Sequence, residues 1–359
     1  MIRSVQFAIF GVFFFSMFLL LSYLLFWSSS FLFIIPRGWQ FWGLVLLSTI
    51  GYVSMAAAMV SRGLWARIVS FAGSVWLGVS VEALVVLLPC DLIRRFIPID
   101  PQSAAIAVLI VITVLTVSSI VAWLILRRKT IELPVSKLTR ALRVVQLSDL
   151  HMGASRGTNY LERVISATNS LEPEAILITG DLADDERFYA TGSVHVYDAF
   201  KAPVFMSMGN HEDYGAYRPD AQFPNAKIRV LRNEYVDLGD YQLIGIDYGY
   251  SAGDVGKLLS GLKYDRSKYT ILMNHAPVGL EEASQQGVDL MLSGHTHQGQ
   301  FFPFNFLVRL VYRRGGGLYR HGSTTLYTSP GTGTWGPPLR FGSFNEVTLF
   351  VLRPSKDSR

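Results

Sequence analysis

Five short polar motifs contain five of the seven histidines in this chain of 359 residues. The motifs are Ser148-Asp149-Leu150-His151, Gly180-Asp181, Gly209-Asn210-His211-Glu212, Asn274-His275 and Gly294-His295-Thr296-His297. Carboxylates, an amide oxygen and imidazoles form a mixed set of hard and borderline ligands, which suits Mn²⁺, iron or Zn²⁺ better than Mg²⁺ or Ca²⁺. Two aspartates, one asparagine and four histidines are too many for one tetrahedral ion, and they fit two ions that share a carboxylate.

The spacing inside the motifs predicts that pairs of donors face one pocket. Asp149 and His151 are two residues apart, as are His295 and His297, and side chains at that spacing point to the same side of an extended segment. Glycines stand before Asp181, Asn210 and His295, where they allow sharp turns.

The elements that must position these motifs alternate between strands and helices. Apolar runs predict buried strands at 143–147, 175–179, 203–208, 269–273, 288–292 and 347–352. Helical spacing is found at 159–171, and residues 235–247 are typical of a hairpin. This order predicts an α/β core with some antiparallel sheet, and it places the motifs at strand ends, where such sheets bind ligands.

The five motifs, in this order, resemble those of the calcineurin-like metallophosphoesterase superfamily over residues 143–352. The resemblance implies a calcineurin-like α/β/β/α sandwich that binds two divalent metal ions. The ligands it implies for the first ion are Asp149, His151 and His297; those for the second are Asn210, His275 and His295; and Asp181 would bridge the two. A hydroxide between the ions is then expected to attack phosphorus.

Two residues of the third motif have other expected roles. The resemblance implies that His211 is catalytic without binding metal, and that it contacts the phosphoryl oxygens or the leaving group. Glu212 stands where many relatives have aspartate, and we expect it to orient a neighbouring residue.

The first third of the chain has the composition of a membrane region. Half of all residues are hydrophobic, only 16% are charged and the mean hydropathy is +0.32. Four stretches are long enough to cross a bilayer, at 5–27, 39–60, 68–88 and 103–126. We therefore expect a four-helix transmembrane region over 1–130, a basic connector at 131–142 and the metallophosphoesterase domain at 143–359.

The distribution of charge predicts the orientation of the chain. Residues 1–130 hold 9 Lys/Arg and 3 Asp/Glu, whereas the rest of the chain holds 23 and 24 and is nearly neutral. A nearly neutral domain disfavours binding to nucleic acid. Positive residues near helix ends favour a catalytic domain in the cytoplasm. With the resemblance, this implies an integral protein of a bacterial inner membrane.

Two apolar segments have features that an anchor alone does not require. Ser70, Ser74, Gly78 and Glu82 recur every four residues, so they share one helix face and turn Glu82 toward neighbouring helices. Glu82 is either functional or a carboxyl group hydrogen-bonded to another helix. The second segment, 301–312, follows the last metal-binding motif, and it either packs on the core or covers an acyl chain or the membrane interface.

The substrate class is predicted from the membrane region and from a narrower resemblance. The motif from Gly294 to Gln300 and the glycine-rich segment 329–340 are similar to those of membrane-associated bacterial members, some of which hydrolyse UDP-2,3-diacylglucosamine. The leading hypothesis is a membrane-anchored phosphoesterase for a lipid phosphate or a lipid-linked nucleotide. The alternatives are a tethered phosphodiesterase for a soluble nucleotide and a non-catalytic membrane sensor or transport module. The sequence leaves the oligomeric state open.

Overall fold

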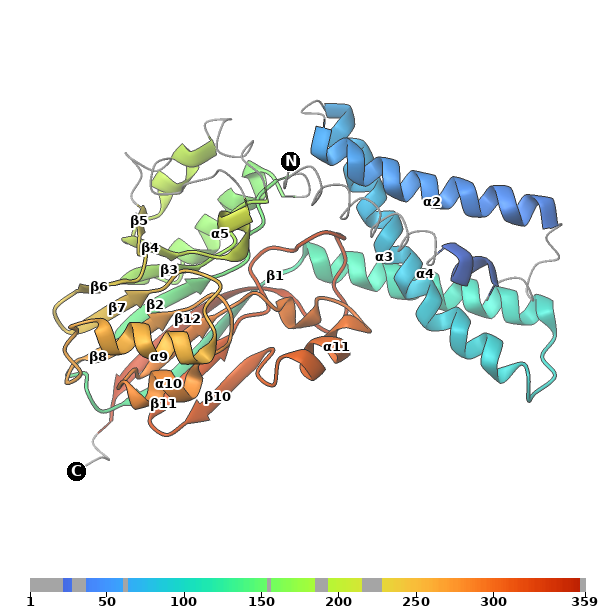
Figure 1. Cartoon of the computed structure of the whole chain (residues 1–359). Coiled ribbons are helices and arrows are strands. Elements are labelled where there is room, and N and C mark those ends of the chain that lie inside the picture. The colour runs from blue at the N-terminus through green and yellow to red at the C-terminus, as the bar shows by residue number, and fades with distance from the viewer. Residues whose placement is uncertain are drawn as a thin grey trace, which may run out of the picture. The chain divides into compact units, whose positions relative to one another are not determined.

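A computed structural model of the protein describes residues 22–27, 37–60, 64–153, 156–184, 193–214 and 228–355 (Figure 1). The chain divides into two compact units. The first comprises Met1–Val121 and Gly336–Phe341, and the second comprises Ala122–Trp335 and Gly342–Arg359.

The first unit is helical. Its long helices are α2 (Arg37–Val60), α3 (Leu64–Ile93) and α4 (Pro101–Leu124). Within the described residues, two helical stretches are long and apolar enough to cross a membrane: Ile68–Ile93, with a mean hydropathy of 2.0, and Pro101–Leu124, with 2.7. The structure therefore supports two of the four predicted spans. The predicted span 5–27 lies largely outside the described residues, and the apolar stretch in α2, Phe41–Gly51, is shorter than a membrane crossing needs.

The two membrane-length helices differ from their predicted bounds for reasons that involve proline. Helix α3 continues through Pro89 to Ile93, because a proline this near the end of a helix removes one hydrogen bond without stopping the last turn. Helix α4 begins at Pro101, the position where a helix tolerates proline best. Its first turn is capped by Asp100, which accepts a hydrogen bond of 2.8 Å from the backbone N–H of Ser103.

Glu82 is buried between these helices, with 4% of its surface exposed. Its carboxyl group is hydrogen-bonded to two hydroxyl groups of α4, those of Thr116, at 2.9 Å, and Ser119. These contacts match the simpler of its two predicted roles, a hydrogen bond to another helix.

The second unit contains two six-stranded sheets. The first sheet has the order β1 (Leu126–Val135), β12 (Asn345–Pro354), β2 (Leu142–Leu147), β3 (Ala175–Thr179), β4 (Val204–Ser207) and β5 (Ile228–Val230). The second has the order β10 (Gly317–His321), β11 (Thr324–Thr328), β9 (Leu290–Ser293), β8 (Tyr269–Met273), β7 (Tyr241–Gly245) and β6 (Glu234–Asp237). The predicted inner strands and the hairpin, which forms from β6 and β7, are confirmed to within a few residues.

The sheets pack face to face, and helices cover their outer faces (Figure 1). Side chains from both sheets, among them Leu177 and Ile271, form the core between them. Helix α5 (Thr158–Asn169) packs on the first sheet, whereas α9 (Ala252–Gly261) and α10 (Leu280–Gln285) pack on the second. Because both faces of each sheet are covered, the inner strands are continuous apolar runs. The predicted mixed α/β fold is confirmed.

The junction before this domain differs from the expected connector. Residues Leu126–Val135 form β1, which pairs in parallel with β12 along all ten of its residues. The strand lies at the edge of its sheet and most of its side chains are exposed, so its polar, basic sequence is compatible with a strand. The compact unit accordingly starts at Ala122, inside the last turn of α4.

The last turn of α4 is capped by side chains of the same unit. Arg156 donates to the carbonyl oxygen of Trp123 at 2.7 Å, Arg163 donates to that of Leu124 at 3.2 Å, and the Asn345 amide also reaches Trp123. Cationic side chains at this end also complement the helix dipole.

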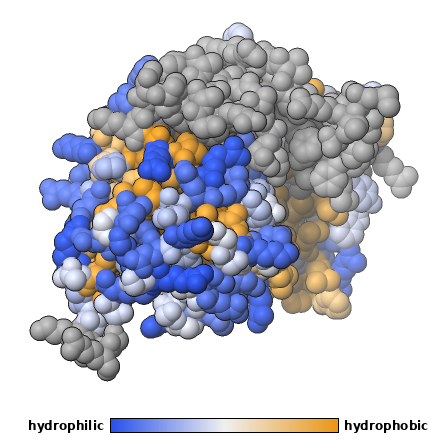
Figure 2. All heavy atoms as spheres, turned by 60° about the vertical axis from the view of Figure 1, so that its left-hand side comes forward, coloured by the Kyte–Doolittle hydropathy of each residue, from blue (hydrophilic) through white to orange (hydrophobic). Residues whose placement is uncertain are grey.

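The surface of the molecule that Figure 2 presents is largely hydrophilic, with smaller hydrophobic patches between the polar side chains. Helix α11 (Phe304–Val311) departs from this pattern, because none of its residues is buried and most of them are apolar. Of the two alternatives for 301–312, packing on the core is therefore not found for α11, and within this segment only Phe301 is buried.

Candidate metal centre

The predicted ligands lie in loops that follow five strands of the two sheets. Asp149 and His151 follow β2, Asp181 follows β3, and Asn210 begins the short helix α7 (Asn210–Tyr214) after β4. His275 follows β8, and His295 and His297 follow β9. Strands β2, β3 and β4 run parallel, as do β8 and β9, so within each sheet the loops emerge at one edge.

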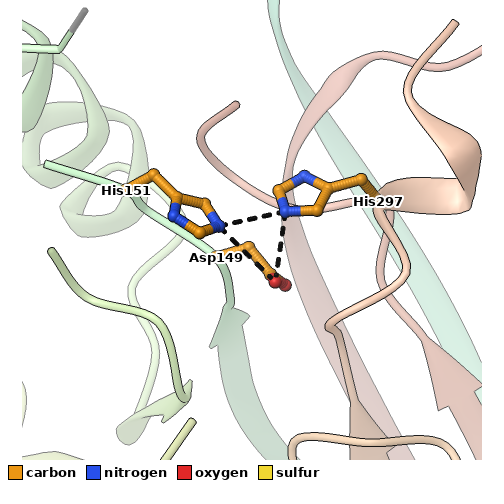
Figure 3. Close-up of side chains that lie close together, drawn as sticks. All are labelled: Asp149, His151 and His297. Carbon is orange, nitrogen blue, oxygen red and sulfur yellow. Dashed lines mark hydrogen bonds and ion pairs between the residues drawn. The ribbon is translucent and has the colours of Figure 1, made fainter. Parts of the chain in front are cut away.

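One group of donors consists of Asp149, His151 and His297, which point toward one another (Figure 3). The Nε2 atoms of His151 and His297 are 3.0 Å apart. The Asp149 Oδ1 atom is 3.4 Å from Nε2 of His297 and 4.0 Å from Nε2 of His151. All three side chains are buried.

A second group contains Asp181, His275 and His295, with Asn210 beside them. The amide oxygen of Asn210 is 3.1 Å from Nε2 of His275 and 2.8 Å from Nδ1 of His295. These atoms are so close that one small cation could contact all of them.

Asp181 lies between the two groups. Its Oδ2 atom is 3.7 Å from Nε2 of His151, in the first group, and 3.2 Å from Nε2 of His275, in the second. Its other oxygen accepts a hydrogen bond of 2.9 Å from the backbone N–H of His211, which fixes the orientation of the carboxylate. This is the place that the bridging role assigned to Asp181 requires.

Two histidines are held so that their Nε2 atoms face the other donors of the centre. Nδ1 of His275 is 2.7 Å from the carbonyl oxygen of Thr179, which can only accept, so this nitrogen carries the proton. Nδ1 of His151 is 2.6 Å from Oδ1 of Asp184. A carboxylate or carbonyl on the far nitrogen is the usual support of a metal-bound histidine.

The backbone of the ligand loops is left-handed at several candidate ligands. The φ angles are 52° at Asp149, 47° at His151, 53° at Asp181, 69° at His295 and 49° at His297. Asp149 and His151 do share one group of donors, but the expected reason, an extended segment, is wrong, and His295 and His297 belong to different groups. Left-handed backbone is costly for residues other than glycine and is concentrated at functional sites.

Gly294 has a different role from the expected one of forming a turn. Its φ angle is not left-handed, but a Cβ atom at this position would lie 1.9 Å from Oγ of Ser148 and 2.1 Å from Oδ2 of Asp149. Glycine is required here because the backbone passes directly over the Asp149 carboxylate. The adjacent N–H of His295 donates to that carboxylate, at 3.0 Å.

Glu212 joins two ligand loops through their backbones. Its carboxylate accepts hydrogen bonds from the N–H groups of Asp181, at 2.9 Å, Leu182, at 2.7 Å, and Gly209, at 2.8 Å. Burial and the neighbouring Asp181 raise the pKa of Glu212 to about 7, although the backbone donors act in the opposite direction. Its expected orienting role therefore has a structural basis in these three hydrogen bonds.

His211 lies at the edge of the centre. Its ring is edge-on to that of His151, with centroids 4.7 Å apart, and its Nδ1 atom is 3.4 Å from Oδ1 of Asp184. Burial and the nearby His151 lower the pKa of His211. It also forms a third group of possible ligands with His151 and Asp184.

Sequence reasoning missed Asp184, which contacts both His151 and His211. Its only signal is that it stands three residues after Asp181. Tyr312 was also missed as a site residue, and its hydroxyl group lies 3.1 Å from Nε2 of His295. Tyr248 stacks near His295 with ring centroids 5.4 Å apart.

The glycine-rich segment 329–340 supports the loop that contains Asp149 and His151. The backbone N–H groups of Thr332 and Gly333 donate to the carbonyl oxygens of Ser148, at 2.6 Å, and Asp149, at 2.9 Å. A Cβ atom on Gly333 would lie 1.9 Å from the Leu150 carbonyl oxygen, so the two segments are in close contact.

Burial and neighbouring charges shift the pKa values of several residues in the centre. Burial alone would lower the pKa of His151 and His275, but the carboxylates outweigh it: Asp184 is the main cause of a rise to about 9 at His151, and Asp181 of a rise to about 10 at His275. Burial raises the pKa of Asp149, whereas burial and His275 lower the pKa of His295 to about 4. Such mutually perturbed groups are typical of functional sites.

A cavity of about 210 Å³ adjoins the second group. It is lined by Met208, Arg232, Asp247, Tyr248, Gly249 and Tyr250. Arg232 is held by Asp247, with nitrogen–oxygen distances of 3.1 and 3.0 Å. Because Tyr248 contacts both the cavity and the histidines, a molecule in this cavity would lie beside the candidate ligands.

The residues fit two divalent cations. Each of the two main groups places three side-chain donors within 4.8 Å of one another. The donors are carboxylate and imidazole, with an additional amide oxygen, which is a set that Mn²⁺, iron and Zn²⁺ accept. The structure brings all seven predicted ligands to one place and puts His211 beside them.

Comparison with known proteins supports this interpretation. Residues 142–299 match the family described as calcineurin-like phosphoesterase. The chain is 35% identical over 246 residues to an uncharacterized metallophosphoesterase of Helicobacter pylori, a match that covers 65% of this chain and 66% of that protein. It is 33% identical to one of Campylobacter jejuni, over 64% of this chain and 63% of that one.

A transmembrane relative is also found. The chain is 33% identical over 251 residues to a transmembrane protein with a metallophosphoesterase domain from Danio rerio, a match that covers 62% of this chain and 56% of that protein. The matches thus span about two thirds of the length of these relatives or less. Together with the apolar helices α3 and α4, this name indicates membrane association.

Proposed function

Because the chain belongs to the calcineurin-like phosphoesterases through residues 142–299, we propose that it is a membrane-anchored phosphoesterase dependent on two metal ions. It hydrolyses a phosphate ester or diphosphate bond of a lipid or of a lipid-linked nucleotide. The domain faces the cytoplasm from a bacterial inner membrane, as the positive charges near the helix ends favour.

The position of Asp181 between two groups of donors is the observation that carries this proposal. The Asp181 Oδ2 atom is 3.7 Å from Nε2 of His151 in the first group and 3.2 Å from Nε2 of His275 in the second. A carboxylate shared by two groups of histidines is what a two-ion site requires and a single-ion site does not. Asp149, His151 and His297 would hold one ion, and Asn210, His275 and His295 the other.

The roles of the protein's own groups follow from their contacts. Bound divalent ions would supply Lewis-acid stabilisation of the phosphoryl oxygens and activate water as a nucleophile. Glu212 and Asp184 keep the ligands in position, Glu212 through backbone N–H groups and Asp184 through the imidazole of His151. His211, at the edge of the centre, hydrogen-bonds a phosphoryl oxygen or the leaving group of the substrate.

A soluble nucleotide is the second candidate substrate. It is favoured by the cavity beside His275 and His295, where Tyr248 and Tyr250 offer rings for stacking on a base. In this alternative the membrane helices only tether the enzyme.

A hydrolysis panel with the full-length protein tests the proposal. The protein is reconstituted in nanodiscs, loaded with Mn²⁺ and given lipid phosphates, lipid-linked diphosphates and soluble nucleotides. We expect release of phosphate or nucleotide from a lipid substrate, and loss of at least about 10³-fold in Asp181→Asn. The control is Asp240→Asn, an exposed carboxylate in the β6–β7 turn.

The outcomes separate the alternatives. Hydrolysis of soluble nucleotides alone would favour the second candidate. No hydrolysis of any substrate by metal-loaded protein would favour the non-catalytic sensor or transport module, for which Glu82→Gln rather than Asp181→Asn should then abolish the cellular role.

A further inference from the structure

Helix α11 presents an apolar face that the rest of the described structure leaves uncovered. The exposed fractions are 63% at Phe306, 72% at Leu310 and 75% at Val311. Phe302, Phe304 and Leu307 add further exposed apolar surface at and before the helix. A contiguous patch of this kind on a water-facing domain marks an interaction site.

An ordinary surface helix buries its large apolar side chains, whereas α11 exposes them. Its partly buried residues are Asn305 and Val308, followed at helical spacing by Tyr312. Asn305 contacts Gly299 and Val308 contacts Gly315, as the positions of Cβ atoms built on these glycines indicate. The side that packs on the domain is therefore narrow, and the larger aromatic and aliphatic side chains face outward.

Helix α11 lies next to the loop that contains His295 and His297. At its start, the backbone of Asn305 packs against Gly299, two residues after His297. At its end, the Tyr312 hydroxyl group lies 3.1 Å from Nε2 of His295. The hydroxyl group of Thr296, between the two histidines, donates to the Gly315 carbonyl oxygen at 2.8 Å. A surface that α11 touches therefore lies next to the metal ligands.

The charges around α11 are those that an anionic membrane attracts. Residues 301–314 contain no acidic side chain, and Arg309 and Arg313 are exposed. Arg314 is instead engaged with Glu281 of α10, with a nitrogen–oxygen distance of 2.9 Å. Phenylalanine and leucine on one face with arginine beside them are typical of helices that lie in the plane of the membrane interface.

The connection to α4 provides the second argument for a bilayer as the occupant. Only Ile125 separates the end of α4 from β1, the first strand of the domain that contains α11. Arg156 and Arg163 donate to the carbonyl oxygens of Trp123 and Leu124, in the last turn of α4. A domain tethered this closely to a membrane-length helix meets lipid at a high effective concentration.

We propose that α11 lies in the membrane interface. Phe306, Leu310 and Val311 enter the acyl region, while Arg309 and Arg313 contact the phosphates of anionic lipids. This inference rests on the membrane anchoring of the proposed function, and it adds how a lipid substrate reaches the centre: its phosphate comes to the metal ligands beside Tyr312 while its chains stay in the bilayer.

A depth measurement on the full-length chain tests the insertion directly. Cys90, the only cysteine in the chain, is first replaced by serine. A nitroxide label is then attached to the cysteine of the Leu310→Cys variant, in nanodiscs of phosphatidylcholine and phosphatidylglycerol. We expect the label to be accessible to oxygen and protected from a water-soluble nickel complex. The control, Ser260→Cys on the exposed side of α9, should be open to the nickel complex.

Two results would overturn the proposal. Equal exposure of the labels at Leu310 and Ser260 to the nickel complex would mean that α11 faces water. Protection of the Leu310 label from both reagents would mean that protein covers α11, either a second copy or the helical unit.

An activity comparison separates this inference from the proposed function. The double variant Leu310→Glu/Val311→Glu should lose at least about tenfold of its activity on a lipid phosphate in vesicles and keep its activity on a soluble phosphodiester. Ser260→Glu should keep both. If the Leu310 label is inserted but no lipid is hydrolysed, this inference stands and the lipid substrate is excluded. If a lipid is hydrolysed while the label faces water, the lipid substrate stands and this inference is excluded.

Discussion

At the scale of single residues, the candidate centre depends on groups outside the seven predicted metal ligands. Asp184 holds Nδ1 of His151, and Thr179 holds Nδ1 of His275 through its carbonyl oxygen, so that both histidines present Nε2 to the centre. Glu212 joins the loop of Asp181 to the loop of Gly209 and Asn210 through backbone hydrogen bonds. Preorganisation of this kind reduces the cost of bringing buried donors together.

Replacement of Asp184 by alanine should weaken metal binding by about 10–100-fold, because His151 loses the carboxylate that fixes its ring. Calorimetric titration of Mn²⁺ into metal-free protein measures this. Asp240→Ala, far from the motifs in sequence, should leave the affinity unchanged. Equal affinities for all three proteins would show that Asp184 does not position the histidine.

Gly294→Ala should also reduce metal affinity, since the new methyl group would lie 2.1 Å from Oδ2 of Asp149 and must displace it. Gly253→Ala, in α9, is a matched control, because nothing lies within 4 Å of a Cβ atom there. Both variants are compared by the same titration and by thermal unfolding. A Gly294→Ala protein with native affinity would contradict the close approach described here.

At the scale of elements, the ligands lie in loops that follow the strands, and α10 and α11 form the surface beside these loops. The pair Glu281–Arg314 connects the first turn of α10 to the residues after α11. Arg314 lowers the pKa of the Glu281 carboxyl group from its usual 4.5 to about 2.

The contribution of this pair should depend on pH. A carboxyl group whose pKa is lower in the folded than in the unfolded chain stabilises the fold above the unfolded value, and it loses that effect as the pH falls toward the folded value. The difference in Tm between the native protein and Glu281→Gln should therefore be largest above about pH 5 and shrink toward about pH 2. It should correspond to less than about 1 kcal/mol, because solvent screens the half-exposed pair. A difference that does not change with pH would exclude this ion pair as its source.

At the scale of the whole molecule, hydropathy predicted the inner strands well because strands covered on both faces must be apolar runs. The same signal could not find β1, whose residues Leu126–Val135 are mostly exposed at a sheet edge and pair with a strand far away in sequence. It also could not find Asp184 or Tyr312, whose importance comes from where folded loops place them.

The motif order predicted the family, but the reason for the convergence of its side chains was partly wrong. Asp149 and His151 meet through left-handed backbone rather than through an extended segment, and no spacing rule contains that information. The span predicted at 68–88 is also shorter than helix α3, which continues through Pro89 to Ile93.

Removal of bound metal should destabilise the whole domain. Asp149 and Asp181 are buried carboxylates that the ions would neutralise, so chelation leaves them to repel each other. Saturation at about a hundred times Kd is worth about 2.7 kcal/mol, and Tm should fall accordingly when a chelator is added. Asp181→Ala, which lacks the bridging ligand, should show little response to the chelator; a native-sized fall in its Tm would argue against a shared carboxylate.

The pairing of β1 with β12 has a consequence for biosynthesis. Strand β1 leaves the ribosome directly behind α4, but β12, its neighbour in the sheet, is translated much later, as the Glu132–Arg353 ion pair, 221 positions apart, illustrates. The nascent chain must keep an open strand edge throughout that interval, and the charges of Arg127, Arg128 and Lys129 protect it from premature association. Ribosomes stalled before β12 should therefore carry an intermediate that proteases can still cut at β1.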